Sequence, residues 1–568
     1  AATANPLLRH YEWLGSNDWV IDGSKSATGK PMLANDPHLG LRNPNIWYEI
    51  QLATSDGKLN VAGFSFAGIP GVVVGHNQSI AWGVTNVGPD VQDLFLEKLD
   101  PTAHPGQYLY KDQWLPYQIV TETIKVKGQP DEALAVRITK HGPLITDVMT
   151  ATDTSKLQPM TLDWVGNQKE GLVNAVLALD HAQNWEQFRA ALKGWVQAGQ
   201  NFVYADQQGN IGYQATGRVP IRAKGDDGML PVEGWTGAHD WNEYVPFEQL
   251  PMLYNPPSHY VATANFRPNA SDYQYFLGAR FATPWRIMRI REMIAAKDKL
   301  SQADMEAIQH DQHSVQARAI GAKLAALHSS DPLVQQAIDR FKNWDGSLAG
   351  DSATAAIYEL AYLQMLQLTF KDNLGADLFK EYINTSGAEA GLWLYENLDN
   401  PNASWWDDVT TASKETRDDI MLKSISNAVA DLKGRLGANI DGWQWNKLHT
   451  ITFAHPLGSV KPLDIFLNQG PYPVGGDSST INVSPYDLYT AMTDNTYTQD
   501  WVPSYRAVYD LTDWSKTQIV MPMGEAATTG ASHVNDQTPL WLGNGYLAFP
   551  YDQAAIDAAK EGTLTLTP

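Results

Sequence analysis

The stretch that decides the fold is Leu14–Ile21, which reads LGSNDWVI. A small, flexible glycine precedes Ser16, and a polar pair and a β-type run follow at once. Taken alone, such a Gly-Ser pair is most often a turn that leads into a strand. The meaning of Ser16 therefore depends on the motifs that accompany it along the chain.

Composition excludes several classes of protein before any motif is considered. The 568 residues carry a formal net charge of -22, with 63 acidic against 41 basic side chains. This balance argues against nucleic-acid binding, which needs clustered Lys and Arg, and against binding to anionic membranes. No apolar run approaches the roughly 20 residues needed to span a bilayer. Because the chain has no cysteine, disulfides, thiol nucleophiles and cysteine-bound zinc are excluded.

Periodicity divides the chain into a β-rich part, a helical part and a second β-rich part. Residues from about Asn17 to Asn265 contain short β-type runs, whereas the pattern from about Trp285 to Leu436 is helical, with Ser301 as an N-cap. After Gly442 the β-type pattern returns. The predicted strands and the predicted hairpin turn include Asn60–Phe66, Gly71–Gly75, a turn at Gly209, Asp464–Leu467, Thr480–Val483 and Thr517–Met521.

Several motifs downstream of Ser16 occur in a recognisable order. They are residues 34–40 (ANDPHLG), 68–71 (GIPG), 75–77 (GHN), 81–86 (AWGVTN), 204–206 (YAD), 209–213 (GNIGY) and 262–265 (ATAN). In this order and spacing the chain resembles the β subunit of the penicillin acylase family, within the N-terminal nucleophile hydrolases. The resemblance extends from Ser16 to about Phe549.

The resemblance implies a fold class and a domain organisation. The fold expected is α+β, with a four-layer αββα core formed by residues 16–285 and 440–568 and a helical insertion at about 286–439. Residues 1–15 resemble the tail of a linker peptide, so a precursor would cut itself between Gly15 and Ser16. The resemblance also implies an α subunit from the same precursor, which would form a heterodimer with this chain, and a periplasmic or secreted location.

The implied chemistry is amide hydrolysis through an acyl-enzyme on Ser16. An N-terminal serine carries its own base, because a free α-amine has a pKa of about 7.7–8.0. By position, the donors to the oxyanion are the backbone N–H of Asn86 and the side-chain amide of Asn265. His38 and Arg286 match residues that position the nucleophile, its amine and the asparagine. Two alternatives stay open: His38 could cap a turn, and Arg286 could be an ordinary ion-pair residue.

A structural calcium ion is also implied by the resemblance, and no organic cofactor. The expected ligands are Asp90, the carbonyl of Gln92, and Asp93, since two carboxylates with backbone oxygens suit a hard cation. The alternative is a solvated acidic loop.

The substrate is expected to be a small N-acylated molecule, bound near Pro37, Leu39, Val74 and Gln200. Leu39 and Val74 stand where phenylacetyl-selective relatives have aromatic pocket residues, and Gln200 stands where another apolar residue is expected. This favours an aliphatic or wider acyl pocket. N-acyl homoserine lactones are thus as plausible as penicillin-type β-lactams.

An alternative hypothesis from another class of protein is a carbohydrate-binding protein or a glycosidase. The 20 Trp and 24 Tyr residues and the acidic balance are compatible with it, since sugars stack on aromatic rings. Against it, no acidic pair of the kind that cleaves glycosides stands out in a β-strand context.

Overall fold

The computed structural model describes residues 15–149, 157–168 and 171–567. Two seven-stranded antiparallel sheets form its centre. The first sheet has the order β20 (Tyr260–Thr263), β1 (Ser16–Ile21), β2 (Met32–Gly40), β25 (Arg506–Asp510), β26 (Gln518–Val520) and β27 (Leu547–Ala548), and β24 (Trp501–Pro503) also pairs with β2. The second sheet has the order β19 (Met252–Tyr254), β15 (Ile211–Ala215), β14 (Gln200–Asp206), β6 (Ile80–Asn86), β5 (Val74–Asn77), β4 (Asn60–Phe66) and β3 (Trp47–Ala53).

The two sheets pack face to face through alternate side chains of their strands. Val20 and Leu33 of the first sheet belong to the same buried cluster as Val74 of the second. Phe64 of β4 stacks on Tyr505, just before β25, with ring centroids 3.9 Å apart. Because strand residues alternate between faces, the neighbours of these residues point to the outer faces of the sheets, where other elements must bury them.

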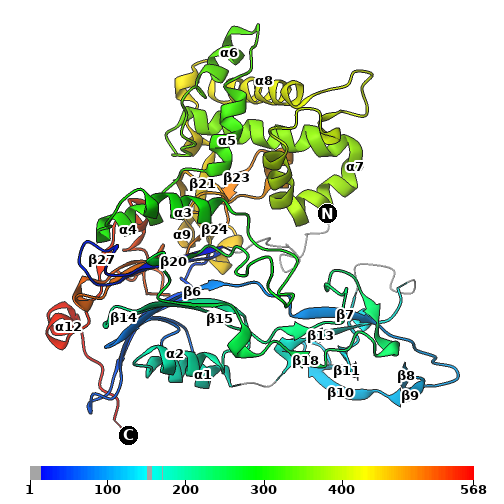
Figure 1. The fold of residues 1–568 in the computed structure, drawn as a ribbon, viewed down its shortest axis with the longest axis vertical. Coiled ribbons are helices and arrows are strands. Elements are labelled where there is room, and N and C mark those ends of the chain that lie inside the picture. The colour runs from blue at the N-terminus through cyan, green and yellow to red at the C-terminus, as the bar shows by residue number, and fades with distance from the viewer. Residues whose placement is uncertain (1–14, 150–156, 169–170, 568) are drawn as a thin grey trace.

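Helices cover the outer face of each sheet (Figure 1). Helices α1 (Leu172–Asp180) and α2 (Trp185–Leu192) lie on the second sheet, where Phe188 packs on Phe202 and Tyr204. Helices α3 (Trp285–Ala295) and α4 (Gln302–Gln309) lie on the first sheet, where Ile287 shares a buried cluster with Trp19. Ser301 begins α4 with a capping box, as the sequence predicts.

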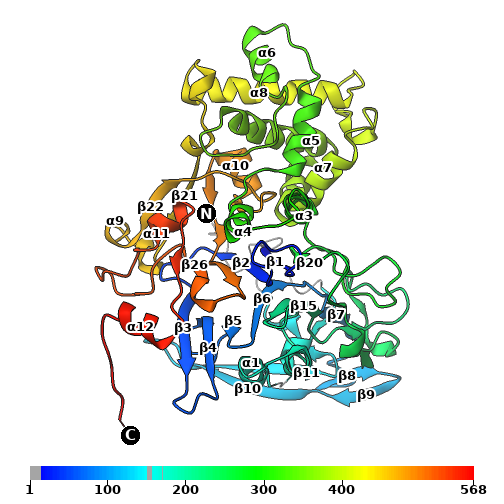
Figure 2. The same ribbon diagram turned by 60° about the vertical axis from the view of Figure 1, so that its left-hand side comes forward.

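A second helical group packs around its own core above the sheets (Figure 2). It contains α5 (Val315–Leu324), α6 (Pro332–Asp339), α7 (Ala353–Glu396), which is interrupted at Gly375 and Ser386, and α8 (Arg417–Leu436). The helical insertion expected at about residues 286–439 includes α3 and α4, and these two helices cover the first sheet. The separately packed helices therefore begin at Val315. Periodicity alone cannot tell which surface a helix covers.

The remaining elements extend the two ends of the sheets. A β-rich lobe on the right of Figure 1 contains β7 (Gln92–Leu96), β8 (Gln107–Tyr110), β9 (Gln113–Pro116), β10 (Gln118–Ile124), β11 (Glu132–Thr139), β12 (Gly142–Pro143), β13 (Met160–Trp164), β16 (Pro220–Ile221), β17 (Val232–Glu233) and β18 (Glu243–Tyr244). The C-terminal part adds β21 (His449–Phe453), β22 (Gln469–Pro473), β23 (Tyr497–Gln499), α9 (Asp464–Leu467), α10 (Leu488–Asp494), α11 (Thr538–Leu542) and α12 (Gln553–Ala559). Among the helices of the described residues, none combines the length and apolar character needed to cross a bilayer.

Local predictions from the sequence have mixed outcomes. The hairpin β14–β15 turns at Gly209, whose φ of 102° is favourable for glycine, and β4 and β26 lie where strands are predicted. Strand β5 begins only at Val74. The predicted strand Asp464–Leu467 is the helix α9, because short apolar runs do not distinguish helix from strand. The predicted strand Thr480–Val483 is absent, since Asp477 accepts hydrogen bonds from the N–H groups of Ser479 and Thr480 and forms a turn.

Candidate active site

Ser16 is the first residue of β1 and is 6% exposed. It pairs with Pro37 of β2. Its N–H donates to Oδ1 of Asn265 over 2.6 Å, and its hydroxyl donates to the Gly15 carbonyl, also over 2.6 Å. Both the nitrogen and the hydroxyl of Ser16 are therefore oriented by fixed neighbours, and the hydroxyl lies beside the peptide bond that precedes it.

Asn265 connects Ser16 to the second sheet. It follows β20 in a left-handed conformation with φ of 64°, which asparagine tolerates better than most residues. Its Oδ1 accepts from Ser16 and from Nη2 of Arg286 (3.1 Å). Its Nδ2 donates to the carbonyl of Asn86, the last residue of β6, over 2.9 Å. The side-chain amide thus uses its acceptor on Ser16 and its donor on the opposite sheet.

The carbonyl of Asn86 also accepts from Nδ2 of Asn201 at 3.2 Å. The next amide, that of Val87, donates to the Gly199 carbonyl, so the Asn86 N–H points away from β14. Asn86 and Asn265 are therefore brought together, with the N–H of Asn86 outside the ladder between β6 and β14.

Arg286 lies buried in the first turn of α3. Its guanidinium donates to three oxygens, all of them neutral: the Ser16 carbonyl (2.8 Å), Oδ1 of Asn17 (2.9 Å) and Oδ1 of Asn265. Within the described part of the chain it makes no ion pair, so it is not an ordinary ion-pair residue. Burial lowers its pKa to about 10, which leaves it positively charged at neutral pH.

His38 lies in β2, so it does not cap a turn. Its Nε2 is 2.9 Å from Oδ2 of Asp36, which also accepts from Nδ2 of Asn17 at 3.0 Å. Its backbone N–H donates to the Gly15 carbonyl, and its Nδ1 has no hydrogen-bond partner among the described residues. A methyl group added to Gly15 would lie 2.6 Å from this nitrogen. Burial, reinforced by the charge of Arg286, lowers the pKa of His38, so the imidazole is neutral at physiological pH.

Two residues of this site are missing from the sequence prediction. Asn17 donates to Asp36 and accepts from Arg286, and Asp36 fixes the ring of His38. Both are completely buried. The signal that could have found them is a polar run inside a strand, since residues 35–38 (NDPH) interrupt an otherwise apolar β2 and buried Asp is rare unless partnered.

The predicted pocket residues separate into two groups. Alternation along β2 and β5 places Leu39 and Val74 toward the space between the sheets, where Val74 is fully buried and Leu39 packs against the same cluster. Pro37 pairs with Ser16 directly. Gln200 is different, because alternation along β14 puts its side chain on the face of Phe202, which packs on α2. Gln200 therefore lies on the other face of its sheet from Val74, and its place in the substrate pocket stays a prediction.

The predicted calcium ligands surround an arginine. Arg222 donates from Nη2 to Oδ1 of Asp90 and from Nε to Oδ2 of Asp93, each over 2.9 Å. Trp241 also donates to Asp93, over 2.6 Å. Gln92, which lies between the two aspartates in the sequence, is the first residue of β7. Over residues 15–149, 157–168 and 171–567 no cluster of three or more metal-ligating side chains occurs. The guanidinium supplies the positive charge that an ion would bring, so these residues do not fit calcium in this arrangement, and the ion stays a prediction.

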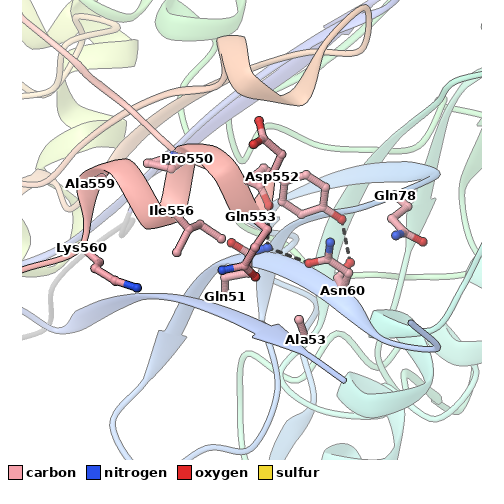
Figure 3. A pocket seen from close by; sticks show the side chains of 11 residues that line it. Gln51, Ala53, Asn60, Gln78, Pro550, Asp552, Gln553, Ile556, Ala559 and Lys560 are labelled. Atoms are coloured by element: carbon pink, nitrogen blue, oxygen red, sulfur yellow. Dashed lines mark hydrogen bonds between the residues drawn. The ribbon is translucent and has the colours of Figure 1, made fainter. Parts of the chain in front are cut away.

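A large pocket of about 810 Å³ lies between β3, β4 and α12 (Figure 3). Gln51, Asn60, Gln78, Ile556 and Lys560 line it. Gln51 donates to Oδ1 of Asn60 over 2.7 Å. No predicted site residue lines this pocket, so it is not the candidate active site.

The chain belongs to the penicillin amidase family, whose model matches residues 2–558. It is 30% identical over 595 residues to the acyl-homoserine lactone acylase QuiP of Pseudomonas aeruginosa, a match that covers 97% of this chain and 69% of that protein. It is 27% identical to the penicillin acylase 2 proenzyme of Pseudomonas sp. strain SE83, with 98% and 69% covered. It is 30% identical to penicillin G acylase of Escherichia coli, with 76% and 53% covered.

The fold is similar to that of a solved structure, a thermostable penicillin G acylase from Alcaligenes faecalis. The TM-score is 0.73 at 22% identity, covering 97% of this chain and 99% of that one. Family and relatives together make this chain an amide-hydrolysing acylase. The alternative of a carbohydrate-binding protein or a glycosidase is excluded, because the model of an acylase family matches nearly the whole chain.

Proposed function

We propose that this chain is an N-terminal nucleophile hydrolase in which Ser16 first cuts its own precursor and then deacylates N-acylated small molecules. The observation that carries the proposal is the position of Ser16, with its hydroxyl 2.6 Å from the Gly15 carbonyl and its nitrogen on Asn265. The order of helices and sheets described above supports the four-layer αββα core of such enzymes.

In the self-cleavage step, Oγ of Ser16 attacks the carbonyl carbon of Gly15. The C–N bond breaks as the C–O bond forms, the hydroxyl proton passes to the nitrogen, and water then hydrolyses the ester to free Gly15 as a carboxylate. His38 is the group beside this bond that can accept a proton, since its neutral Nδ1 faces Gly15 without a partner. Asp36 orients the ring through Nε2.

In the turnover step, the freed α-amine of Ser16 takes the hydroxyl proton as Oγ attacks the substrate amide. The amide N–H groups of Asn265 and the backbone N–H of Asn86 receive the developing oxyanion. Arg286 holds Oδ1 of Asn265, so the asparagine keeps its donor directed away from α3. The amine leaves, and water releases the acyl group from Ser16 as a carboxylic acid.

The substrate we favour is an N-acyl homoserine lactone. The relative at 30% identity over nearly the whole chain is named for that activity, and Leu39 and Val74 offer aliphatic rather than aromatic surface. The second candidate is a penicillin-type β-lactam, favoured by the two penicillin acylases among the relatives.

The same proposal includes a partner and a location. The relatives are longer than this chain, which spans 69% of the first one. Large apolar side chains are exposed around α9, and Ile465 is 75% exposed and Phe466 68%. Such a surface suits coverage by an α subunit from the same precursor, forming a heterodimer. Periplasmic or secreted localisation rests on the family resemblance alone.

The test of processing is intact mass spectrometry of the expressed precursor and of Ser16→Ala. We expect the unaltered precursor to yield a fragment that starts at Ser16, and Ser16→Ala to stay full-length and folded. The two proteins are also assayed on acyl-homoserine lactones and p-nitroanilides of four to twelve carbons, and on phenylacetyl compounds. Cleavage of Ser16→Ala at the same bond without added protease would refute the assignment of the nucleophile. A tenfold preference for phenylacetyl over every aliphatic substrate would refute only the choice of substrate.

A further inference from the structure

A polar cavity of about 330 Å³ lies between the helical group and the C-terminal part of the first sheet. Its walls come from the segment after Leu348, from β22 and the loop that follows it, and from the end of α11. Asp351 is an exposed residue at this cavity, whereas Arg506 is 1% exposed. Arg506 is thus a buried cation in the wall of a space large enough for a small organic ion.

The guanidinium of Arg506 is fixed by neutral groups. Its Nη2 donates to Oδ1 of Asn482 over 2.8 Å, its Nη1 donates to the Trp541 carbonyl over 3.2 Å, and its Cζ lies 4.9 Å from the centre of the Trp541 ring. Its Nε has no hydrogen-bond partner among the described residues. An arginine has five N–H groups, so three remain for a ligand.

No buried carboxylate pairs with Arg506 among the described residues, and the acid at the cavity, Asp351, is exposed. Arg286 and Arg506 are both buried, and the carboxylate whose charge acts on both is Asp36. The oxygen of Asp36 that has partners is used by Asn17 and His38, and neither arginine contacts it. Among the residues that the structure describes, Asp36 is thus the buried carboxylate shared by the two buried arginines. An unpaired buried charge is costly, so a second anion next to Arg506 would be strongly favoured.

The cavity is separate from the space that Ser16 faces. In β25, Ala507 packs between the sheets and Val508 packs with α3 and α4, so Arg506 points to the outer face with Val508. In β1, Asp18 faces Gly83 of the second sheet, so Ser16, two residues earlier, lies on the inner face. A ligand on Arg506 would not occupy the position of the acyl substrate.

We propose that this cavity binds a carboxylate, with Arg506 as its charged anchor. A carboxylate matches the flat fork of a guanidinium and would engage the free Nε–H and an Nη N–H together. The carboxylate is either a small free acid or an Asp or Glu side chain from the additional length that the relatives possess. The site goes beyond the proposed hydrolase function and does not depend on the role of Ser16.

The test uses the complete processed protein and sodium acetate as the probe, with sodium chloride at equal ionic strength as the reference. Isothermal titration calorimetry measures acetate affinity, and a crystal structure grown in acetate identifies the group on Nε of Arg506. Saturable acetate binding with acetate on Nε assigns a free acid as the ligand. A protein carboxylate on Nε with no acetate binding assigns the internal source. Absence of both a bound acetate and a protein carboxylate at Nε overturns the proposal.

Variants separate this site from other cationic groups. If acetate binds, Arg506→Lys should weaken its affinity at least tenfold, because a single ammonium cannot replace the fork. Asp351→Asn, which changes only an exposed acid at the cavity, should strengthen binding a few-fold at low salt and have no effect at high salt. Arg435→Lys is the matched control, since Arg435 already pairs with Asp431. Equal loss in Arg435→Lys and Arg506→Lys, or unchanged affinity in Arg506→Lys, overturns the assignment of Arg506. If a protein carboxylate fills the site, Arg506→Lys should displace it in the crystal structure.

Discussion

Arg286 and Arg222 are two buried arginines in different chemical situations. Arg286 donates only to neutral oxygens, on Ser16, Asn17 and Asn265, whereas Arg222 donates to the carboxylates of Asp90 and Asp93. The two carboxylates neutralise the charge of Arg222, which suits a structural ion pair. The charge of Arg286 is left uncompensated beside Ser16, where it can stabilise negative charge that develops during a reaction. The partners of a buried charge thus distinguish the structural cluster from the proposed catalytic one more clearly than burial does.

The largest effect should come from Asn265, whose side-chain oxygen accepts a hydrogen bond from Arg286. Asn265→Ala removes an amide that would donate to the oxyanion and that also accepts from the Ser16 nitrogen and donates to the Asn86 carbonyl. We expect kcat to fall by roughly 10²–10³, or about 2.7–4 kcal/mol. Steady-state kinetics on processed protein measure it. A loss that appears only in KM would make Asn265 a substrate-binding residue instead.

A loss of stability should follow in the structural cluster. Arg222→Met leaves Asp90 and Asp93 unpaired and should cost about 3 kcal/mol of unfolding free energy, the lower end of the usual range, because Asp90 is partly solvated. Denaturant unfolding measures the cost.

The same variant tests the predicted calcium site. If the carboxylates accept calcium once the guanidinium is gone, added calcium should restore the unfolding temperature of Arg222→Met. Elemental analysis of the dialysed unaltered protein is the companion measurement. Calcium found there would mean that the ion and Arg222 coexist, and would contradict the view of Arg222 as its replacement.

A smaller effect should come from changing Arg286 itself. Arg286→Lys keeps the charge but cannot reach three acceptors, so kcat/KM should fall about 10- to 100-fold, the worth of one charge-assisted hydrogen bond of about 1.5–3 kcal/mol. Arg222→Lys is the matched control and should leave kcat/KM nearly unchanged. Equal losses in the two variants would remove the distinction between the clusters.

The smallest effect concerns Asp18, a buried acid near Ser16 with no hydrogen-bond partner on its carboxyl group among the described residues. Burial, with the charge of Asp36, raises its pKa well above the ordinary value. The folded state therefore holds a proton that the unfolded state releases above about pH 4, and the free energy of unfolding declines as the pH rises from there. Asp18→Asn should flatten this decline in a series of unfolding temperatures between acid and neutral pH. Asp22 is the control, because its pKa is lowered and Asp22→Asn should change the profile in the opposite direction. An unchanged slope in Asp18→Asn would contradict the burial argument.

The sequence predicts the neighbourhood of Ser16 better than it predicts the pocket. Sequence motifs identify five residues of this neighbourhood without any knowledge of their contacts, and the structure brings them together: Ser16, His38, Asn86, Asn265 and Arg286. The structure places Gln200 on the opposite face from Val74, which the sequence could not show, because side-chain direction in a strand depends on register and one residue of shift reverses the face.

The sequence does not reveal the roles of Asn17 and Asp36 for a related reason. Their importance comes from contacts between β1, β2 and α3, which are far apart in sequence. The sequence likewise assigns α3 and α4 to the helical insertion, because an amphipathic pattern does not show which surface a helix will pack against. Long-range pairing, rather than local pattern, decides each of these cases.

Gly15 has a practical consequence for anyone who rebuilds this protein. A methyl group at that position would lie 2.6 Å from Nδ1 of His38 and 3.2 Å from Nη2 of Arg286. A tag, a shortened leader or a heterologous partner fused directly ahead of Ser16 must therefore end in glycine if the junction is to fit. Libraries that vary the junction should return glycine at the last place before the serine, whatever stands further upstream.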